Sequence, residues 1–160
     1  MPSFSTRRHV DFTAEQMFDL VADVDSYPEF VPLCEALRVT SRKRGPDRET
    51  LIATMAIGYK SIRERFTTRV TLLPDKQQIL VEYLDGPFRH LENRWRFVPS
   101  GSGCDVDFYI TYEFRSRMLA LVMGAVFDKA FRKFASAFEG RARQLYRPPL
   151  GTICPAPTTA

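Results

Sequence analysis

The sequence predicts an α+β protein with a helix-grip fold, in which a seven-stranded antiparallel sheet wraps around a long C-terminal helix. Three observations lead to this prediction. A short helical pattern follows the first strand, a hydrophobic period of two then runs from about residue 35 to 114, and a helical period follows Arg117. A sheet with one apolar face needs a cover, which the long helix supplies.

At the N-terminus we expect a strand over Phe4–Phe12 and a helix from about residue 14 to residue 24. Thr13 and Gln16 have the spacing of a capping box, in which each side chain accepts a hydrogen bond from the other residue's backbone N–H. The apolar residues that follow at helical spacing are Met17, Leu20, Val21 and Val24.

The stretch DVDSYPEFVPLCEA, residues 23–36, ends this helix and leads to a second strand near Leu37–Arg42. Pro28 and Pro32 fix their own φ angles and bias the preceding residues toward extended conformations. We therefore expect a stiff segment at the open end of the grip, facing the start of the long helix. It would form either one edge of a pocket mouth or a plug that closes the core. Its bulky residues are Tyr27, Phe30, Val31 and Leu33.

The remaining strands alternate apolar and polar residues, as strands with one buried face do. Clusters of Gly, Pro, Ser and Asp predict tight turns between them and so a mostly sequential antiparallel order. These turns lie at Pro46-Asp47, Gly58–Ser61, Pro74–Lys76, Asp85–Pro87 and Pro99–Gly103.

The last element is a helix from Arg117 to about Tyr146, roughly 45 Å long at 1.5 Å per residue. Pro148 and Pro149 stop it, and we expect the proline-containing tail to be disordered. The sequence thus predicts one domain over residues 1–146 and a disordered tail over residues 147–160. The apolar stripe of the helix comprises Met123, Phe127, Phe131, Phe134, Phe138, Ala142 and Leu145.

Composition favours a cytoplasmic protein. The chain has 160 residues, a formal charge of +4 and three cysteines without a CxxC pair, which fits a reducing compartment. The N-terminus has no apolar core of a signal peptide. The longest uncharged apolar run, Met118–Phe127, is too short to cross a bilayer, which takes about 20 residues.

The usual signatures of catalysis are absent, so we expect neither an enzyme nor a catalytic cofactor. His9 and His90 fall on outward faces of different strands, and no Cys/His cluster has the spacing of metal ligands. Asp105 and Asp107 share one outward strand face, where solvation is a better interpretation than a catalytic pair.

The predicted inner faces combine large apolar side chains with a few polar ones, among them Glu64 and Thr68. Burying an unpaired polar group costs about 1–3 kcal/mol, so these groups need each other, water or the polar head of a ligand. Alternatively, they lie near strand ends and reach solvent. The residues expected to line a ligand cavity are Phe30, Val31, Leu33, Met55, Tyr59, Phe66, Tyr83, Asn93, Trp95, Phe97, Phe108, Tyr112, Met123, Phe127 and Phe131.

The start of the long helix, MLALVMGAVF, is apolar on every side, whereas a surface helix should have a polar face. Residues 115–147 carry eight basic and two acidic residues. A solvated helix face, an anionic membrane surface and ribosomal RNA are the interpretations left open. The residues expected to contact a membrane or a partner are Tyr27, Arg115, Arg117, Met118, Leu119, Leu121 and Val122.

Three segments, in this order around the helix-grip pattern, resemble the coenzyme Q-binding family of START-like proteins. They are DVDSYPEFVPLC, GPFRHLENRWRFVP and FDKAFRKFASAFEGRA. That family lies in the larger superfamily of polyketide cyclases and the birch pollen allergen. The resemblance covers about residues 1–146 and is specific because the three segments occur together.

The resemblance implies a non-enzymatic protein that binds ubiquinone between sheet and helix and supports respiratory electron transport as a quinone chaperone or carrier. A peripheral position at the inner face of the membrane would suit this role. Close bacterial relatives are named ribosome-association toxins, proposed to bind the large ribosomal subunit and block subunit joining. The motifs do not separate the two roles. We expect no DNA partner, and the sequence leaves the oligomeric state open.

A quinone ring offers only acceptor oxygens and a flat face. It would need a donor, such as a tyrosine hydroxyl or the Asn93 amide, and an aromatic side chain such as Trp95 for stacking. A third class of function, a cyclase or hydrolase, would use Glu64 and the inner tyrosines as acid and base. No nucleophile–base pair in the sequence supports it.

Overall fold

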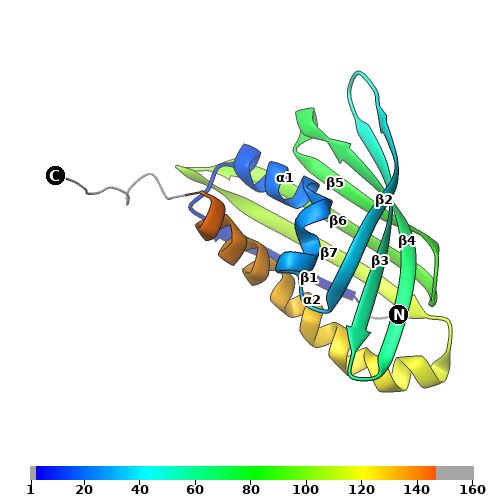
Figure 1. Ribbon diagram of the computed structural model, residues 1–160. Helices are drawn as coiled ribbons and strands as arrows, with labels where there is room; N and C mark the ends of the chain where they lie inside the picture. Colours follow the sequence, from blue (N-terminus) through cyan, green and yellow to red (C-terminus); the bar gives the residue numbers. More distant parts are fainter. Residues whose placement is uncertain (1–2, 147–160) are drawn as a thin grey trace.

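The computed structural model describes residues 3–146, and it has the predicted order of strands and helices. One antiparallel sheet curves around the long C-terminal helix, and the short helices lie between the first two strands (Figure 1). The elements are β1 (Ser3–Val10), α1 (Ala14–Ala22), the 3-10 helix η1 (Val24–Glu29), β2 (Cys34–Arg44), β3 (Glu49–Tyr59), β4 (Ile62–Leu73), the 3-10 helix η2 (Pro74–Lys76), β5 (Gln78–Asp85), β6 (Phe88–Ser100), β7 (Gly103–Phe114) and α2 (Arg117–Leu145).

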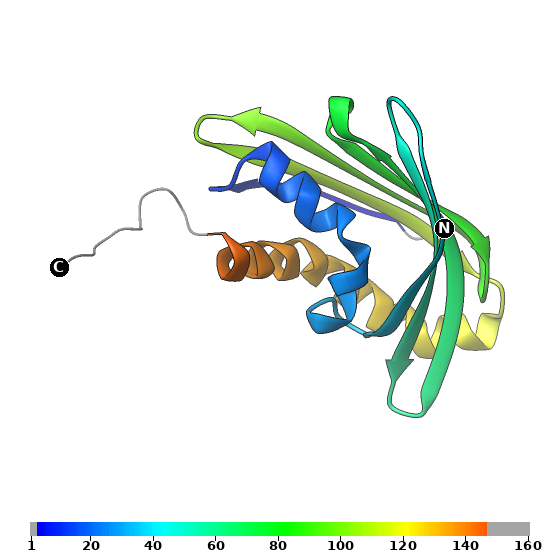
Figure 2. The same cartoon turned by 45° about the horizontal axis from the view of Figure 1, so that its top comes forward.

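The strand order is β1-β7-β6-β5-β4-β3-β2, so six strands follow the sequence and β1 pairs with β7. Helix α2 packs mainly against β7, β1 and α1. Towards the other edge of the sheet, β3 and β4 bend around the N-terminal part of α2 (Figure 2), and neither is among the elements on which α2 mainly packs. This looser part of the grip positions the site described below.

The capping box is present as predicted. The backbone N–H of Gln16 donates to Thr13 Oγ1 and that of Thr13 donates to Gln16 Oε1, both at 3.0 Å. The first strand and the first helix each end two residues earlier than predicted. Phe12 leaves the strand to pack beside Tyr146, with a distance of 6.3 Å between the ring centroids, and Val24 is buried at the start of η1.

The proline segment lies elsewhere than predicted. Its aromatic rings meet the C-terminal half of α2: the centroids of Phe30 and Phe138 are 5.0 Å apart, and Arg141 pairs with Glu29 at 2.8 Å. The expectation that this segment faces the start of the long helix is therefore wrong. The reason is that the Phe stripe extends to Phe138, which offers the segment its largest apolar contact.

A left-handed residue ends the segment. Leu33 has φ 68°, and its carbonyl accepts a 3.1 Å hydrogen bond from the backbone N–H of Gly58. This contact positions the start of β2, which begins at Cys34, three residues earlier than predicted. We name residues Tyr27–Leu33 the strap.

The convex face of the sheet is polar, as the alternation predicts. Asp107 accepts two hydrogen bonds from Arg7, at 2.6 and 2.9 Å, and Asp105 lies 2.9 Å from a ring nitrogen of His9. These ion pairs confirm the outward orientation of the two aspartates.

Candidate functional site

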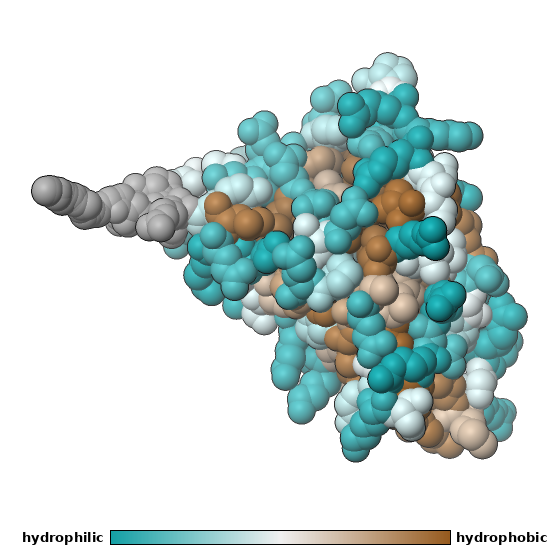
Figure 3. All heavy atoms as spheres, in the orientation of Figure 1, coloured by the Kyte–Doolittle hydropathy of each residue, from teal (hydrophilic) through white to brown (hydrophobic). Residues whose placement is uncertain are grey.

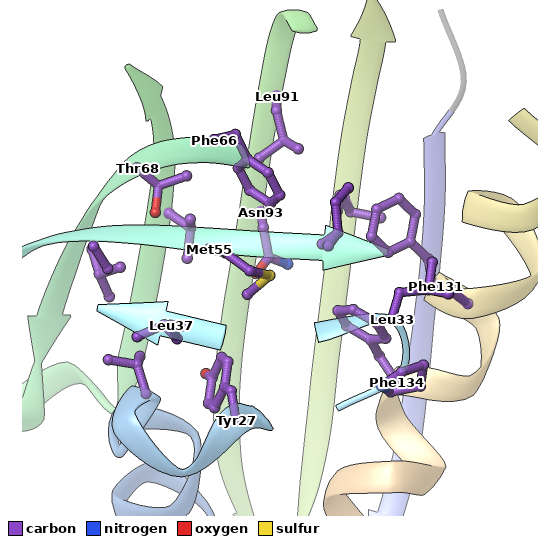
Figure 4. A pocket seen from close by; sticks show the side chains of 18 of the residues that line it. Tyr27, Leu33, Leu37, Met55, Phe66, Thr68, Leu91, Asn93, Phe131 and Phe134 are labelled. Carbon is purple, nitrogen blue, oxygen red and sulfur yellow. The ribbon is translucent and has the colours of Figure 1, made fainter. Parts of the chain in front are cut away.

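A cavity of about 100 Å³ lies where the sheet diverges from α2. Strands β3 to β7 form its floor, and α2 together with the strap covers it (Figure 4). The lining residues are Val24, Tyr27, Pro32, Leu33, Leu37, Ala53, Met55, Ile57, Phe66, Thr68, Val70, Val81, Leu91, Asn93, Trp95, Ile110, Phe127, Ala130, Phe131, Phe134 and Phe138.

The floor follows from the strand register. Ala53 of β3 lies opposite Thr68 of β4, and Val81 of β5 lies opposite Asn93 of β6. Because side chains alternate along a strand, these residues and their neighbours two positions away point to the same face. The roof uses the i, i+3, i+4 and i+7 positions of α2, which carry Phe127, Ala130, Phe131 and Phe134.

Few polar side chains line the cavity. The Asn93 amide is largely committed: its nitrogen donates to the carbonyl of Tyr109 and its oxygen accepts from Trp95 Nε1, both at 2.9 Å. One N–H of that amide remains available. Thr68 is 6% exposed and lines the floor. The Thr68 hydroxyl and the Asn93 amide are thus the side-chain donors that the floor offers.

Tyr27 is the only ionisable residue among the described residues that line the cavity. Its hydroxyl donates to the carbonyl of Val21 at 2.5 Å, and burial raises its pKa far above the ordinary value. Beyond the cavity wall, burial raises the pKa of the Cys34 thiol to about 11, so this thiol is protonated at neutral pH. Such groups are poorly suited to acid–base or nucleophilic catalysis.

The cavity is smaller than a quinone ring requires. A cavity of about 150 Å³ holds a single benzene ring, whereas this one measures about 100 Å³. A ring with substituents and an isoprenoid tail would therefore have to displace lining side chains or the strap.

The structure brings seven of the expected residues together around this cavity: Leu33, Met55, Phe66, Asn93, Trp95, Phe127 and Phe131. Trp95 is 3% exposed and packs against Phe97, Phe108 and Phe138, so its ring faces are mostly covered. The expected stacking of a quinone on Trp95 would therefore require these rings to move.

The other expected lining residues lie outside the cavity. Where α2 touches the sheet, inward-facing residues make solid core, and this accounts for Phe97, Phe108, Tyr112 and Met123. Val31 is buried in the core and Phe30 packs on Phe138. Tyr59 ends β3, and Tyr83 packs on Phe88 with 5.8 Å between centroids. Glu64 also lies outside the cavity, near the start of β4.

Sequence reasoning missed Ala53, Ala130, Val81 and Leu37 because it looked for large or polar side chains. Small residues that face each other across a core are the signal that could have found them, since they leave the volume that large neighbours do not fill. Ala53 on the floor and Ala130 on the roof are both buried.

The expected contact residues on α2 divide by exposure. Met118, Leu121 and Val122 are 74%, 85% and 50% exposed, and Arg115 and Arg117 are exposed as well. Leu119 is half-buried against the core. Tyr27 is placed differently from the expectation: it is half-buried and faces the cavity, because its hydroxyl is held by the Val21 carbonyl.

The described residues contain neither a helix that could cross a bilayer nor a group of metal ligands. None of the helices in residues 3–146 combines the length and the hydropathy that crossing a bilayer requires. Within the same range, His, Cys, Asp and Glu side chains form no group that could hold a metal ion. The expected disordered tail, residues 147–160, and the N-terminal residues 1–2 lie outside the described residues.

Residues 10–139 match the family described as polyketide cyclase / dehydrase and lipid transport. The chain belongs to this family. The description covers both enzymes and lipid carriers, so membership alone does not decide between them.

Two groups of family members are similar to this chain, one named for ribosome association and the other for coenzyme Q binding. The ribosome association toxin RatA of Escherichia coli K12 is 35% identical over 147 residues, which cover 91% of this chain and 90% of RatA. The mitochondrial coenzyme Q-binding protein COQ10 homolog B of Xenopus laevis is 34% identical over 148 residues, covering 89% of this chain and 59% of that protein.

Among solved structures, the 18 kDa protein CC1736 of Caulobacter crescentus is 37% identical, with a TM-score of 0.75, over 91% of this chain and 99% of that one. Together these matches confirm the resemblance and the helix-grip fold expected from the sequence.

Proposed function

We propose that this protein binds ubiquinone, or a closely related isoprenoid quinone, in the cavity and supports respiratory electron transport as a quinone chaperone or carrier. The cavity between the sheet and α2 is the observation that carries the proposal. Its lining is apolar apart from three side chains, Tyr27, Thr68 and Asn93. Such a lining suits an isoprenoid tail, whose burial contributes about 25 cal/mol per Å² of apolar surface. The relative named for coenzyme Q binding supports the same choice.

The donors on the floor suit the quinone ring. A quinone carbonyl only accepts hydrogen bonds, so a protein that binds it must donate. The Thr68 hydroxyl and the remaining N–H of Asn93 can donate. A ring that places its carbonyls at this part of the floor would satisfy both groups.

Entry of the ligand requires movement, because the cavity is too small for the ring. The strap is the part of the cover that the fewest covalent and sheet constraints hold. Leu33 ends the strap at a positive φ. The strap is attached to α2 by ring contacts of Tyr27 and Phe30 with Phe138 and by the pairing of Glu29 with Arg141. We therefore propose that the strap moves outward when the quinone binds.

The test uses the single tryptophan of the chain, Trp95, which lines the cavity. Purified protein is titrated with ubiquinone carrying a short tail while tryptophan fluorescence is recorded. Saturable quenching, stronger for the tailed quinone than for the ring alone, is the expected result. Fluorescence that does not saturate, or that responds equally to both compounds, would contradict the proposal.

We also propose that the protein acts without catalysis. Tyr27 is the only ionisable residue in the described lining, and its raised pKa keeps it protonated. Glu64, the acid or base that a cyclase or hydrolase would need, lies outside the cavity. A turnover that Glu64→Gln abolishes would overturn this part of the proposal.

A second candidate function is association with the large ribosomal subunit, as a regulator that blocks subunit joining. Two observations favour it: the similarity to RatA over 90% of that protein, and a basic segment of α2 in which Lys129 and Lys133 have no acidic partner among the described residues. Binding to RNA phosphates releases counterions and so weakens as salt rises. Salt-sensitive co-sedimentation with large subunits would support this role, and its absence at low salt would exclude it.

A further inference from the structure

One surface of the molecule is not explained by the cavity. Apart from Ala120, the exposed side chains of α2 from Met118 to Lys133 fall on one face of the helix, because their spacings of three, four and seven residues return to the same side. We call this face the exposed stripe. Its first half is apolar and comprises Met118, Leu121, Val122 and Ala125. Its second half is basic and comprises Lys129, Arg132 and Lys133.

The apolar half costs free energy in water. Leu121 is 85% exposed and Met118 is 74% exposed, and they lie next to each other on the helix. These turns of α2 form one end of the molecule (Figures 1 and 2), and brown side chains reach the surface near that end in Figure 3. Exposed apolar side chains gathered in this way mark a contact surface.

The basic half carries positive charge that the neighbouring acidic residues do not neutralise. Arg132 pairs with Asp128 at 3.0 Å, but Lys129 and Lys133 form no ion pair with any described residue. Arg115 and Arg117, just before the apolar half, also have no ion pair within residues 3–146. Residues 115–133 hold five basic residues and one acidic residue. A partner of this surface must therefore be negative as well as apolar.

We infer that the exposed stripe docks on an anionic lipid bilayer, with its apolar half inserted among the acyl chains near the headgroups and its basic half on the lipid phosphates. A bilayer interface offers both chemistries within a depth of about 5–10 Å. An RNA surface would neutralise the lysines but leave Leu121 and Met118 in water. A second copy in a symmetric dimer could cover the apolar half, but it carries the same lysines and so could not neutralise them. The bilayer satisfies both halves of the stripe.

The inference does not depend on which ligand the cavity holds. It identifies the surface through which a protein that carries a membrane lipid would approach the bilayer to take up that lipid. The apolar half lies within the two to three helical turns before Phe127, the first residue of α2 that lines the cavity. Docking would therefore bring that end of the cavity cover close to the lipid.

The experiment is co-flotation of the full chain with vesicles of phosphatidylcholine, with and without phosphatidylglycerol. We expect binding to the anionic vesicles that salt weakens. The double variant Lys129→Gln/Lys133→Gln should bind about 25-fold more weakly, because each lysine near an anionic surface contributes about fivefold. Leu121→Gln/Val122→Gln should lose at least about tenfold even in low salt.

Matched variants control for hydrophobicity and charge. Leu145→Gln removes a 52% exposed leucine from the far end of the same helix. Lys43→Gln/Lys76→Gln removes the same charge from two exposed lysines on other elements. Neither control should change vesicle binding by more than about twofold, since both sites lie outside the stripe.

Three results would overturn the inference. The first is that the wild-type protein does not bind anionic vesicles. The second is that the control variants weaken vesicle binding as much as the stripe variants do. The third is that no protein binds vesicles, while the stripe variants lose binding to large ribosomal subunits. The quinone titration, run without vesicles, should be unchanged in all four variants, so failure of docking is distinguishable from failure of the proposed cavity function.

Discussion

Filling the cavity should separate ligand binding from folding. Ala53 is buried in the middle of the floor, opposite Thr68. Ala53→Leu adds three carbon groups that point into the cavity. The cavity measures about 100 Å³. At about 24 cal/mol per Å³, an empty cavity of this size costs about 2.4 kcal/mol. Three buried carbon groups at about 0.8 kcal/mol each give the same figure.

The gain will be partly offset. Overpacking typically costs about 1–3 kcal/mol, so we expect the free energy of unfolding to stay level or to rise by up to about 1.5 kcal/mol. A domain of this size gains about 2–4 °C in Tm per kcal/mol, so the melting temperature should hold or rise by up to about 5 °C. The same side chain occupies the space that the quinone ring needs, so the Kd for ubiquinone should rise by at least about 100-fold.

The assays are thermal unfolding followed by circular dichroism and the Trp95 fluorescence titration. Ala36→Leu is the matched control, because Ala36 is exposed on β2 and gains the same carbon groups outside the cavity. It should leave the Kd unchanged. If Ala53→Leu folds normally and binds ubiquinone as tightly as wild type, the quinone does not occupy this cavity, and the reasoning is refuted.

Other changes probe the polar groups. Thr68→Val removes a donor from the cavity floor, so ubiquinone affinity should drop about fivefold while stability by urea titration changes little; unchanged affinity would rule out the Thr68 donor. Asn93→Leu leaves Trp95 Nε1 buried without an acceptor and should cost about 1–3 kcal/mol in the same assay; no loss would show that water replaces the amide. The Arg7 guanidinium holds the pKa of Asp107 below its ordinary value of 3.8, so this carboxylate stabilises the fold above that pH and loses its effect as pH falls through the lowered pKa. Asp107→Asn should thus be less stable than wild type at pH 7 and equal to it in strong acid, and a constant difference at all pH values would contradict this cause.

The architecture was predictable from the sequence because its signals are local. The alternation along the strands, the capping box at Thr13 and the Phe stripe of α2 each depend on residues a few positions apart. Only the ends of elements moved, by two or three residues at Phe12, Val24 and Cys34. Such shifts occur where a side chain makes a tertiary contact and the backbone turns out of the element to reach it.

The cavity was only partly predictable because it depends on the curvature of the sheet. Inward-facing residues look alike in the sequence, but Tyr112 meets α2 and becomes core, whereas Phe66 lies where the sheet diverges and lines the cavity. The position of the strap was missed for the same reason. Its contact with Phe138 joins residues that lie more than a hundred positions apart, and neither sequence segment encodes the distance between them.

The most direct test of the proposed function is to identify the lipid that the protein carries when it is purified from cells. Wild type and Ala53→Leu should be purified in parallel, without detergent, from a host that makes ubiquinone, extracted with organic solvent and examined by mass spectrometry. The account predicts ubiquinone in the wild-type extract and little or none in the Ala53→Leu extract. Wild-type protein that carries no quinone, or equal amounts of quinone in both proteins, would contradict it.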